Sequence, residues 1–100
     1  SQSLGLPDVF ALYQNFPNPF NYSTTIKFDL LESAVVTLVV IDAAGREVAE
    51  FLLDTPLNQG QYNYTLSVEG MSSGIYFVTL KAVVEDNLPI VDSRKMIFLK

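Results

Sequence analysis

The chain of 100 residues contains no histidine and no cysteine. Histidine is the commonest general base and the commonest metal ligand, so its absence removes the most frequent catalytic and metal-binding chemistry. Without cysteine the chain forms neither disulfides nor thiolates, and a transition-metal site would depend on carboxylates alone. The sequence therefore argues against histidine-based active sites and cysteine nucleophiles.

Basic residues and long apolar runs are also scarce. Six Lys and Arg stand against eleven Asp and Glu, giving a net charge of −5. No basic cluster is present to neutralise phosphates, so we expect no nucleic-acid partner. The longest apolar run, residues 34–41, is interrupted by Thr37 and is far shorter than the ~20 residues of a membrane span. We expect no transmembrane segment.

The polar residues that remain are weak candidates for catalysis. The serines lack a histidine base, and the lysines that could replace it belong to predicted strand faces, where lysines are usually solvated: Lys27, Lys81 and Lys95. Paired carboxylates could hydrolyse glycosides only if held about 5–10 Å apart across a cleft. The available pairs are Glu47 with Glu50 and Glu85 with Asp86. We expect no catalytic residue.

A metal or cofactor site finds equally little support. Four oxygen-bearing residues near the C-terminus could approach a calcium ion: Glu85, Asp86, Asn87 and Asp92. They do not form the dense Asp/Asn/Gly loop that calcium sites use, and no glycine-rich phosphate loop occurs. We expect no metal and no cofactor.

Apolar residues, by contrast, are abundant at 49%, which predicts one folded domain of 100 residues. They alternate with a period of two in short runs, and no segment has the 3.6-residue stripe of an amphipathic helix. The expected strands cover residues 9–13, 25–30, 35–41, 46–53, 61–68, 75–84 and 90–100. About seven short strands separated by turns predict an all-β, antiparallel β-sandwich.

The alternation also predicts which side chains share a face. The faces expected to form the core carry Tyr62, Tyr64, Leu66 and Val68 in one strand and Tyr76, Val78, Leu80, Ala82 and Val84 in the next. Three further sets each share one face of their strand: Ile26, Phe28 and Leu30; Val36, Leu38 and Val40; and Met96 and Phe98. Residues 35–41 are apolar on both faces, so this strand should be central or covered on its second side. A sugar-stacking platform could instead use five tyrosines, Tyr13, Tyr22, Tyr62, Tyr64 and Tyr76. The alternation assigns the last three of them to the core.

Turn signals separate the strands. Asp42–Gly45 fits a type I turn followed by a glycine in a G1 bulge, and so predicts a tight hairpin. Val48 and Phe51 are three apart, which a bulge near Ala49 or Glu50 would explain. We expect loops or turns at residues 54–60, 69–74 and 85–89.

Residues 14–21 (QNFPNPFN) contain two prolines, three asparagines and two phenylalanines. Pro17 and Pro19 lack N–H groups and cannot both belong to a paired ladder. We therefore predict an extended, kinked crossing that leads into the first long strand. Phe16 and Phe20 should anchor it at the rim of the core.

Four segments match known motifs in the same order along the chain. They are Phe10–Asn21 (FALYQNFPNPFN), Asp42–Val48 (DAAGREV), Gly70 with Ser73–Phe77 (SGIYF), and Arg94–Lys100 (RKMIFLK). Together they resemble the type A C-terminal sorting domains of the type IX secretion system, over about residues 7–100. Each motif alone is weakly specific, whereas four in order are specific.

The resemblance implies a seven-stranded Ig-like sandwich with no catalytic residue. It would follow an N-terminal cargo domain and be read by the outer-membrane export machinery and its sorting and cleavage components. The cargo would be in the periplasm in transit and then secreted or held at the cell surface. The implied sorting-signal positions are Gly74, Ile75, Tyr76, Lys95, Met96, Ile97, Phe98, Leu99 and Lys100. The implied structural motif positions are Pro17, Asn18, Pro19, Phe20, Gly45, Arg46, Glu47 and Gly70.

Several interpretations remain open at this point. Residues 95–100 could be a docking strand that pairs with a receptor, or an ordinary core strand. The domain could instead be an Ig-like accessory or carbohydrate-binding module of a secreted hydrolase, or an adhesive spacer. The chain begins at Ser1 without methionine, so we expect a piece of a longer protein. Residues 1–7 would be a linker or a vector-derived remnant and residues 8–100 the sorting domain.

Overall fold

A computed structural model describes residues 9–100, and seven strands and no helix occur in this part of the chain. The strands are β1 (Phe10–Leu12), β2 (Ser23–Leu30), β3 (Ala34–Asp42), β4 (Glu47–Leu57), β5 (Gly60–Ser67), β6 (Gly74–Val83) and β7 (Ile90–Phe98). The predicted linker at residues 1–7, and with it the boundary at residue 8, lies outside the described residues.

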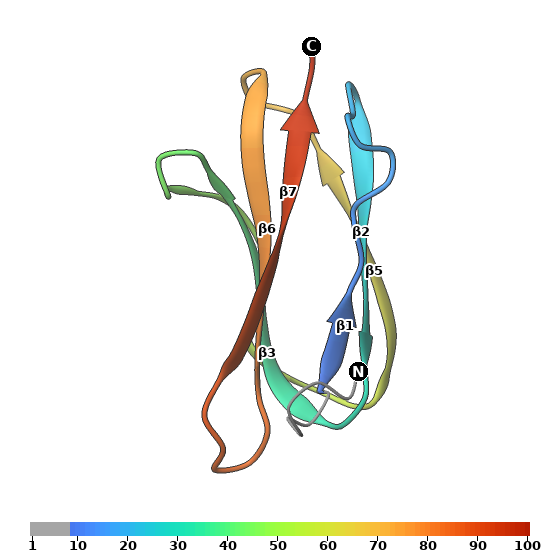
Figure 1. Ribbon diagram of the computed structural model, residues 1–100, viewed down its shortest axis with the longest axis vertical. Coiled ribbons are helices and arrows are strands. Elements are labelled where there is room, and N and C mark those ends of the chain that lie inside the picture. The colour runs from blue at the N-terminus through green and yellow to red at the C-terminus, as the bar shows by residue number, and fades with distance from the viewer. Residues whose placement is uncertain (1–8) are drawn as a thin grey trace.

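The strands form two packed antiparallel sheets (Figure 1). One has the order β1-β2-β5 and the other β4-β3-β6-β7. The chain changes sheet after β2, β4 and β5, an arrangement similar to that of Ig-like sandwiches. The predicted all-β sandwich is confirmed.

The core lies between the sheets and consists of the side chains that alternate inward. The strand residues buried there include Ile26, Phe28, Leu30, Val36, Leu38, Val40, Leu66, Tyr76, Val78, Leu80, Ala82, Met96 and Phe98. Tyr62, Tyr64, Val68 and Val84 are partly buried and pack against this cluster. The expected inner faces of β5 and β6 are confirmed. For β2, β3 and β7 the structure decides which of the two faces points inward.

The double-sided apolar pattern of β3 has a direct explanation. β3 lies between β4 and β6, so its backbone is paired along both edges. Its inner residues are buried, and most of its outer residues are half-buried beside neighbouring strands. The expectation of a central strand is confirmed.

β4 differs from its prediction in length and in bulges. Residues 54–57 continue the strand, and Gly60 already begins β5, so the expected loop at residues 54–60 is wrong. Pro56 is tolerated because β4 is an edge strand, where the missing N–H leaves no carbonyl of a neighbouring strand without a hydrogen-bond donor. Register shifts against β3 fall on either side of Ala49–Glu50, and a third lies nearer Thr55.

The crossing at residues 14–21 confirms one predicted anchor and corrects the other. Phe20 is buried, whereas the side chain of Phe16 is 79% exposed. The backbone of Phe16 pairs with Thr25, whose side chain faces solvent, and directly opposed residues point to the same face. Phe16 therefore points outward and its neighbour Asn15 points inward.

A buried polar network holds this crossing. The Asn15 side chain donates to the Thr24 hydroxyl at 2.9 Å and to the Pro17 carbonyl at 3.1 Å. The Thr24 hydroxyl donates to the same carbonyl at 2.8 Å. Both side chains are almost completely buried, so these bonds satisfy groups that water does not reach. Phe16–Pro17 and Asn18–Pro19 are cis peptide bonds.

The β3–β4 hairpin has the predicted turn. Asp42 Oδ1 accepts hydrogen bonds from the backbone N–H groups of Ala44 and Arg46, each at 2.9 Å. Gly45 has φ +86°, a left-handed conformation that glycine adopts without a Cβ penalty. The N–H of Arg46 is the main reason that the pKa of Asp42 lies below its ordinary value; the N–H of Ala44 and the Arg46 guanidinium add to this effect, while partial desolvation opposes it.

We predict that Thr24→Val lowers the free energy of unfolding by about 1–3 kcal/mol. The substitution keeps the shape but leaves the buried Asn15 amide and Pro17 carbonyl without their shared partner. Urea unfolding measures the change. Thr25→Val, on the exposed side of the same strand, should change stability by less than about 0.5 kcal/mol. Equal effects of the two variants would contradict a role for the network.

We predict that Asp42→Asn is less stable than the parent chain at neutral pH. Because the folded state lowers the Asp42 pKa, the carboxylate contributes its stabilisation above the ordinary pKa of 3.8. That contribution is lost as the pH falls through the lowered folded pKa. Unfolding curves of both chains between pH 7 and 2 should converge below about pH 4. A stability difference that stays constant over this range would show that the charge contributes nothing.

Candidate functional site

Each of the four motifs singled out in the sequence reaches the same end of the sandwich, and the first motif starts in β1 at the opposite end (Figure 1). This end, the motif end, contains the crossing at residues 14–21, the hairpin at residues 42–47, the loop at residues 68–74 and the segment after β7. Antiparallel strands cause the gathering, because β5 and β7 end where β2 and β6 begin. Motifs far apart in the sequence are therefore neighbours in the fold.

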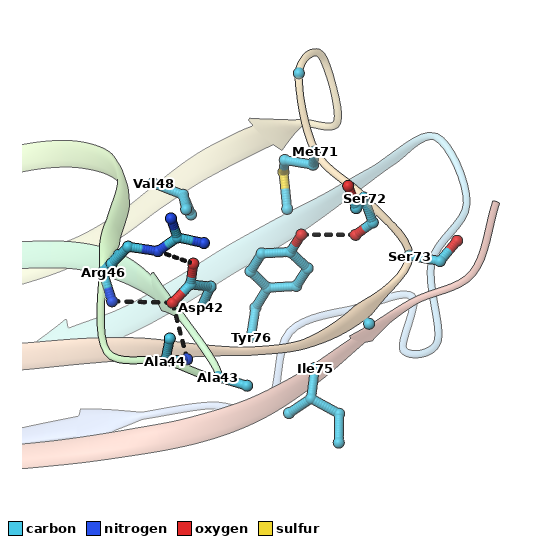
Figure 2. Close-up of a pocket in the computed structure, with 12 residues that line it drawn as sticks. Asp42, Ala43, Ala44, Arg46, Val48, Met71, Ser72, Ser73, Ile75 and Tyr76 are labelled. Carbon is cyan, nitrogen blue, oxygen red and sulfur yellow. Dashed lines mark hydrogen bonds and ion pairs between the residues drawn. The ribbon is translucent and has the colours of Figure 1, made fainter.

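A shallow hollow separates the hairpin from the loop between β5 and β6 (Figure 2). It encloses about 420 Å³, and Asp42, Arg46, Met71 and Tyr76 are among its lining residues. The Tyr76 hydroxyl donates to the Ser72 carbonyl at 2.6 Å, which ties the loop to the start of β6. Gly70, at φ +77°, allows the turn of that loop.

The hollow is not equipped for catalysis. Its carboxylate, Asp42, is engaged by the turn and by the Arg46 guanidinium, with Nε 3.1 Å from Oδ2. No side chain lining it is positioned as a general base for a nucleophile. Figure 2 shows Ile75 pointing away from Tyr76, on the other side of β6.

A second hollow of about 440 Å³ lies between the crossing and the end of β7. Pro17, Pro19, Phe20, Asn21, Leu99 and Lys100 line it. The Lys100 N–H donates to the Ser73 hydroxyl at 2.9 Å, so the segment after β7 also contacts the β5–β6 loop. Leu99 and Lys100 thus connect the crossing to the region around the first hollow.

The structure divides the implied sorting-signal residues into two classes. The exposed ones are Ile75, Lys95, Leu99 and Lys100, and Gly74 and Ile97 are intermediate. Met96 and Phe98 are 0% exposed and Tyr76 is also buried. A receptor that binds the folded domain can touch the first class, whereas the buried side chains act through the position of the backbone.

The structural motif positions divide in the same way. Phe20 is buried and stacks on Phe98, with ring centroids 5.4 Å apart. The others are exposed: Pro17, Asn18, Pro19, Gly45, Arg46, Glu47 and Gly70. Asn18 has a specific contact, because its Oδ1 accepts the Ile97 N–H at 2.9 Å.

β7 is an edge strand, but its terminal part is not open. The Phe20 N–H donates to the Ile97 carbonyl and the Leu99 N–H donates to the Phe20 carbonyl, both at 2.9 Å. The Gln14 side chain donates to the Lys95 carbonyl at 2.7 Å. The folded domain therefore does not offer residues 95–99 as a free edge for an added strand, and it makes Met96 and Phe98 core residues.

The remaining candidates from the sequence do not assemble into a site. Among residues 9–100, no three acidic side chains come together to hold a metal ion. Glu47 and Glu50 are exposed on the outer side of β4 rather than across a cleft. In the same part of the chain no helix has the length and hydropathy needed to cross a membrane.

The tyrosines do not form a single platform either. Tyr62 and Tyr64 stack on Phe28 with centroids 5.2 and 6.3 Å away, and Tyr64 also contacts Phe51. Burial raises the pKa of the Tyr64 hydroxyl. Tyr13 is exposed, and its hydroxyl donates a hydrogen bond to the Asp29 carboxylate. This hydrogen bond raises the pKa of Tyr13.

Sequence reasoning missed the residues that fix the motif end. Gln14, Asn15, Thr24 and Ser73 all make side-chain hydrogen bonds that join separate segments. A polar Asn15 between an apolar strand and two prolines was a signal in the sequence, because asparagine hydrogen-bonds nearby backbone. The long-range partners of Gln14 and Ser73 had no such signal.

Comparison with known families matches residues 14–89 to the secretion system C-terminal sorting domain family. The match includes the crossing, the hairpin and the start of β6, and ends immediately before β7. Neither the curated proteins nor the solved structures contain a match to this chain. Because the match covers more than half of the chain and includes the second and third motifs and most of the first, the chain belongs to the family of C-terminal sorting domains of the type IX secretion system.

Proposed function

We propose that this domain is a non-enzymatic sorting signal that directs an N-terminal cargo across the bacterial outer membrane and is cleaved afterwards. The observation that carries the proposal is that parts of all four motifs, which are far apart in the sequence, meet at one end of the sandwich. A signal needs a stable surface that a receptor can recognise, and this end offers two hollows and no catalytic constellation. Family membership supports the same conclusion.

The direction of the chain supports access to that surface. β1 begins at the end of the sandwich opposite the motif end and runs toward it (Figure 1). A cargo that precedes β1 would attach at the far end of a molecule whose longest dimension is 41 Å. Cargo of different shapes would therefore leave the motif end free for the export machinery and its sorting and cleavage components.

We assign two roles to the signal residues. Ile75, Lys95, Leu99 and Lys100 contact the machinery, because they are exposed beside the two hollows or on the adjoining face of β7. Tyr76, Met96 and Phe98 position them from inside the core. The two lysines give a local positive charge to a domain whose net charge is −5, so the complementary receptor surface would be acidic and partly apolar. On this route the cargo passes through the periplasm and ends secreted or at the cell surface.

We predict that the triple variant Lys95→Ala, Leu99→Ala, Lys100→Ala leaves its cargo in the periplasm. The three side chains are exposed, so thermal unfolding should show a domain as stable as the parent. Cell fractionation measures the cargo, and the matched control is Lys27→Ala on the exposed side of β2. Normal secretion of a folded triple variant would refute contact by these residues.

We predict that Met96→Ala reduces secretion through stability alone. Removal of a completely buried side chain should cost about 2–5 kcal/mol. Secretion should recover at lower growth temperature or with Met96→Leu, which conserves volume. A stable Met96→Ala domain that is still retained would show that the receptor reads Met96 directly. Deletion of residues 95–100 is less informative, because it removes Met96 and Phe98 from the core as well.

A further inference from the structure

The edge of β7 is blocked along most of its length by the chain itself. The N–H and C=O groups of odd-numbered residues point away from β6, as the contacts of Ile97 with the crossing show. Neighbouring side chains occupy both backbone groups of Ser93. The Ser93 N–H donates a hydrogen bond to the Asp92 carboxylate at 2.8 Å, and the Ser93 carbonyl accepts one from the Arg94 guanidinium at 2.9 Å. From Lys95 to Leu99 the edge is hydrogen-bonded to the crossing.

The crossing occupies the place that an additional strand would take. Phe20 forms a parallel bridge with Phe98, and the two rings stack 5.4 Å apart in the core. The Gln14 side chain donates to the Lys95 carbonyl, and Asn18 Oδ1 accepts the Ile97 N–H. These side chains supplement a backbone in which the two prolines have no N–H groups. Edge strands left unpaired are templates for pairing with other chains.

We propose that the Gln14–Phe20 segment is an edge cap that keeps β7 from pairing with β7 of a second copy of this chain. The uncapped edge would present the Lys95 carbonyl, both backbone groups of Ile97 and the Leu99 N–H. This inference concerns the chain by itself and does not depend on the proposed sorting function.

The hydrogen-bonding groups of the edge fit a second copy in one antiparallel register. With Ile97 opposite Ile97 of the other copy, Lys95 faces Leu99 and Arg94 faces Lys100. The apolar residues favour this register, whereas the like charges of Arg94 and Lys100 oppose it. The outer side of β6 and β7 near this point carries Ile75, paired with Ile97, and Phe77. Pairing two edges would therefore extend an apolar stripe across the joined sheet as well as form hydrogen bonds.

The test compares the 100-residue chain with the double variant Gln14→Ala, Asn18→Ala, which removes the two side-chain bonds to the edge. Asn63→Ala is the matched control, because Asn63 is exposed on β5 and its side chain makes no hydrogen bond within residues 9–100. In the double variant, hydrogen exchange of the Ile97 amide should rise about tenfold. Sedimentation over a concentration series should show a dimer at concentrations at least about tenfold lower than for the parent and the control.

A cysteine at position 97 tests the register, since the chain contains no other cysteine. Ile97→Cys in the double-variant background should form an interchain disulfide under mild oxidation, whereas Val91→Cys, exposed on the same strand, should not. A second pair, Asn21→Cys with Leu99→Cys, ties the crossing to β7, and its oxidised form should return the double variant to a monomer.

Three results would overturn the proposal. One is a folded double variant that remains monomeric although the Ile97 amide exchanges faster. Another is unchanged exchange, which would show that the side chains of Gln14 and Asn18 do not hold the cap. The last is a dimer that persists when the crossing is tied to β7, and this test remains valid if the double variant alone folds poorly.

Discussion

The contact between Phe20 and Phe98 connects the first irregular segment of the chain to its last strand. Stacked rings 5.4 Å apart, flanked by two backbone hydrogen bonds of 2.9 Å, join residues 78 positions apart. The contact covers one end of the core and pairs the otherwise open end of β7. It also places Leu99 and Lys100 beside Pro17 and Pro19, so the second hollow depends on it.

The buried Asn15–Thr24 pair stabilises the same crossing. An extended chain with two prolines cannot fill a ladder, so side chains supplement the backbone hydrogen bonds at Phe16 and Phe20. Asn15 and Thr24 supply those bonds inside the protein, where an unsatisfied polar group is costly. The crossing is therefore held by the buried hydrogen bonds of Asn15 and Thr24 and by the buried Phe20 ring.

The same arrangement separates the exposed residues of the motif end from the core. The exposed residues can be changed without loss of core, whereas Tyr76, Met96 and Phe98 hold the backbone on which they lie. A compact sandwich with the cargo connection opposite this surface is a physically simple carrier for such a signal.

The sequence by itself determined the approximate positions of the strands, which side chains share a face and the Asp42–Gly45 turn, because alternation and turn chemistry are local properties. It also determined family membership, since the four motifs are linear. Only the tertiary structure decided that Phe16 faces solvent, that β4 continues through Pro56, and that the edge of β7 is occupied. These features depend on which segments lie side by side. The direction of Phe16 follows from its pairing with Thr25, and Pro56 is accommodated because β4 is an edge strand. The N–H of Ile97 is bonded to Asn18, a partner 79 residues away.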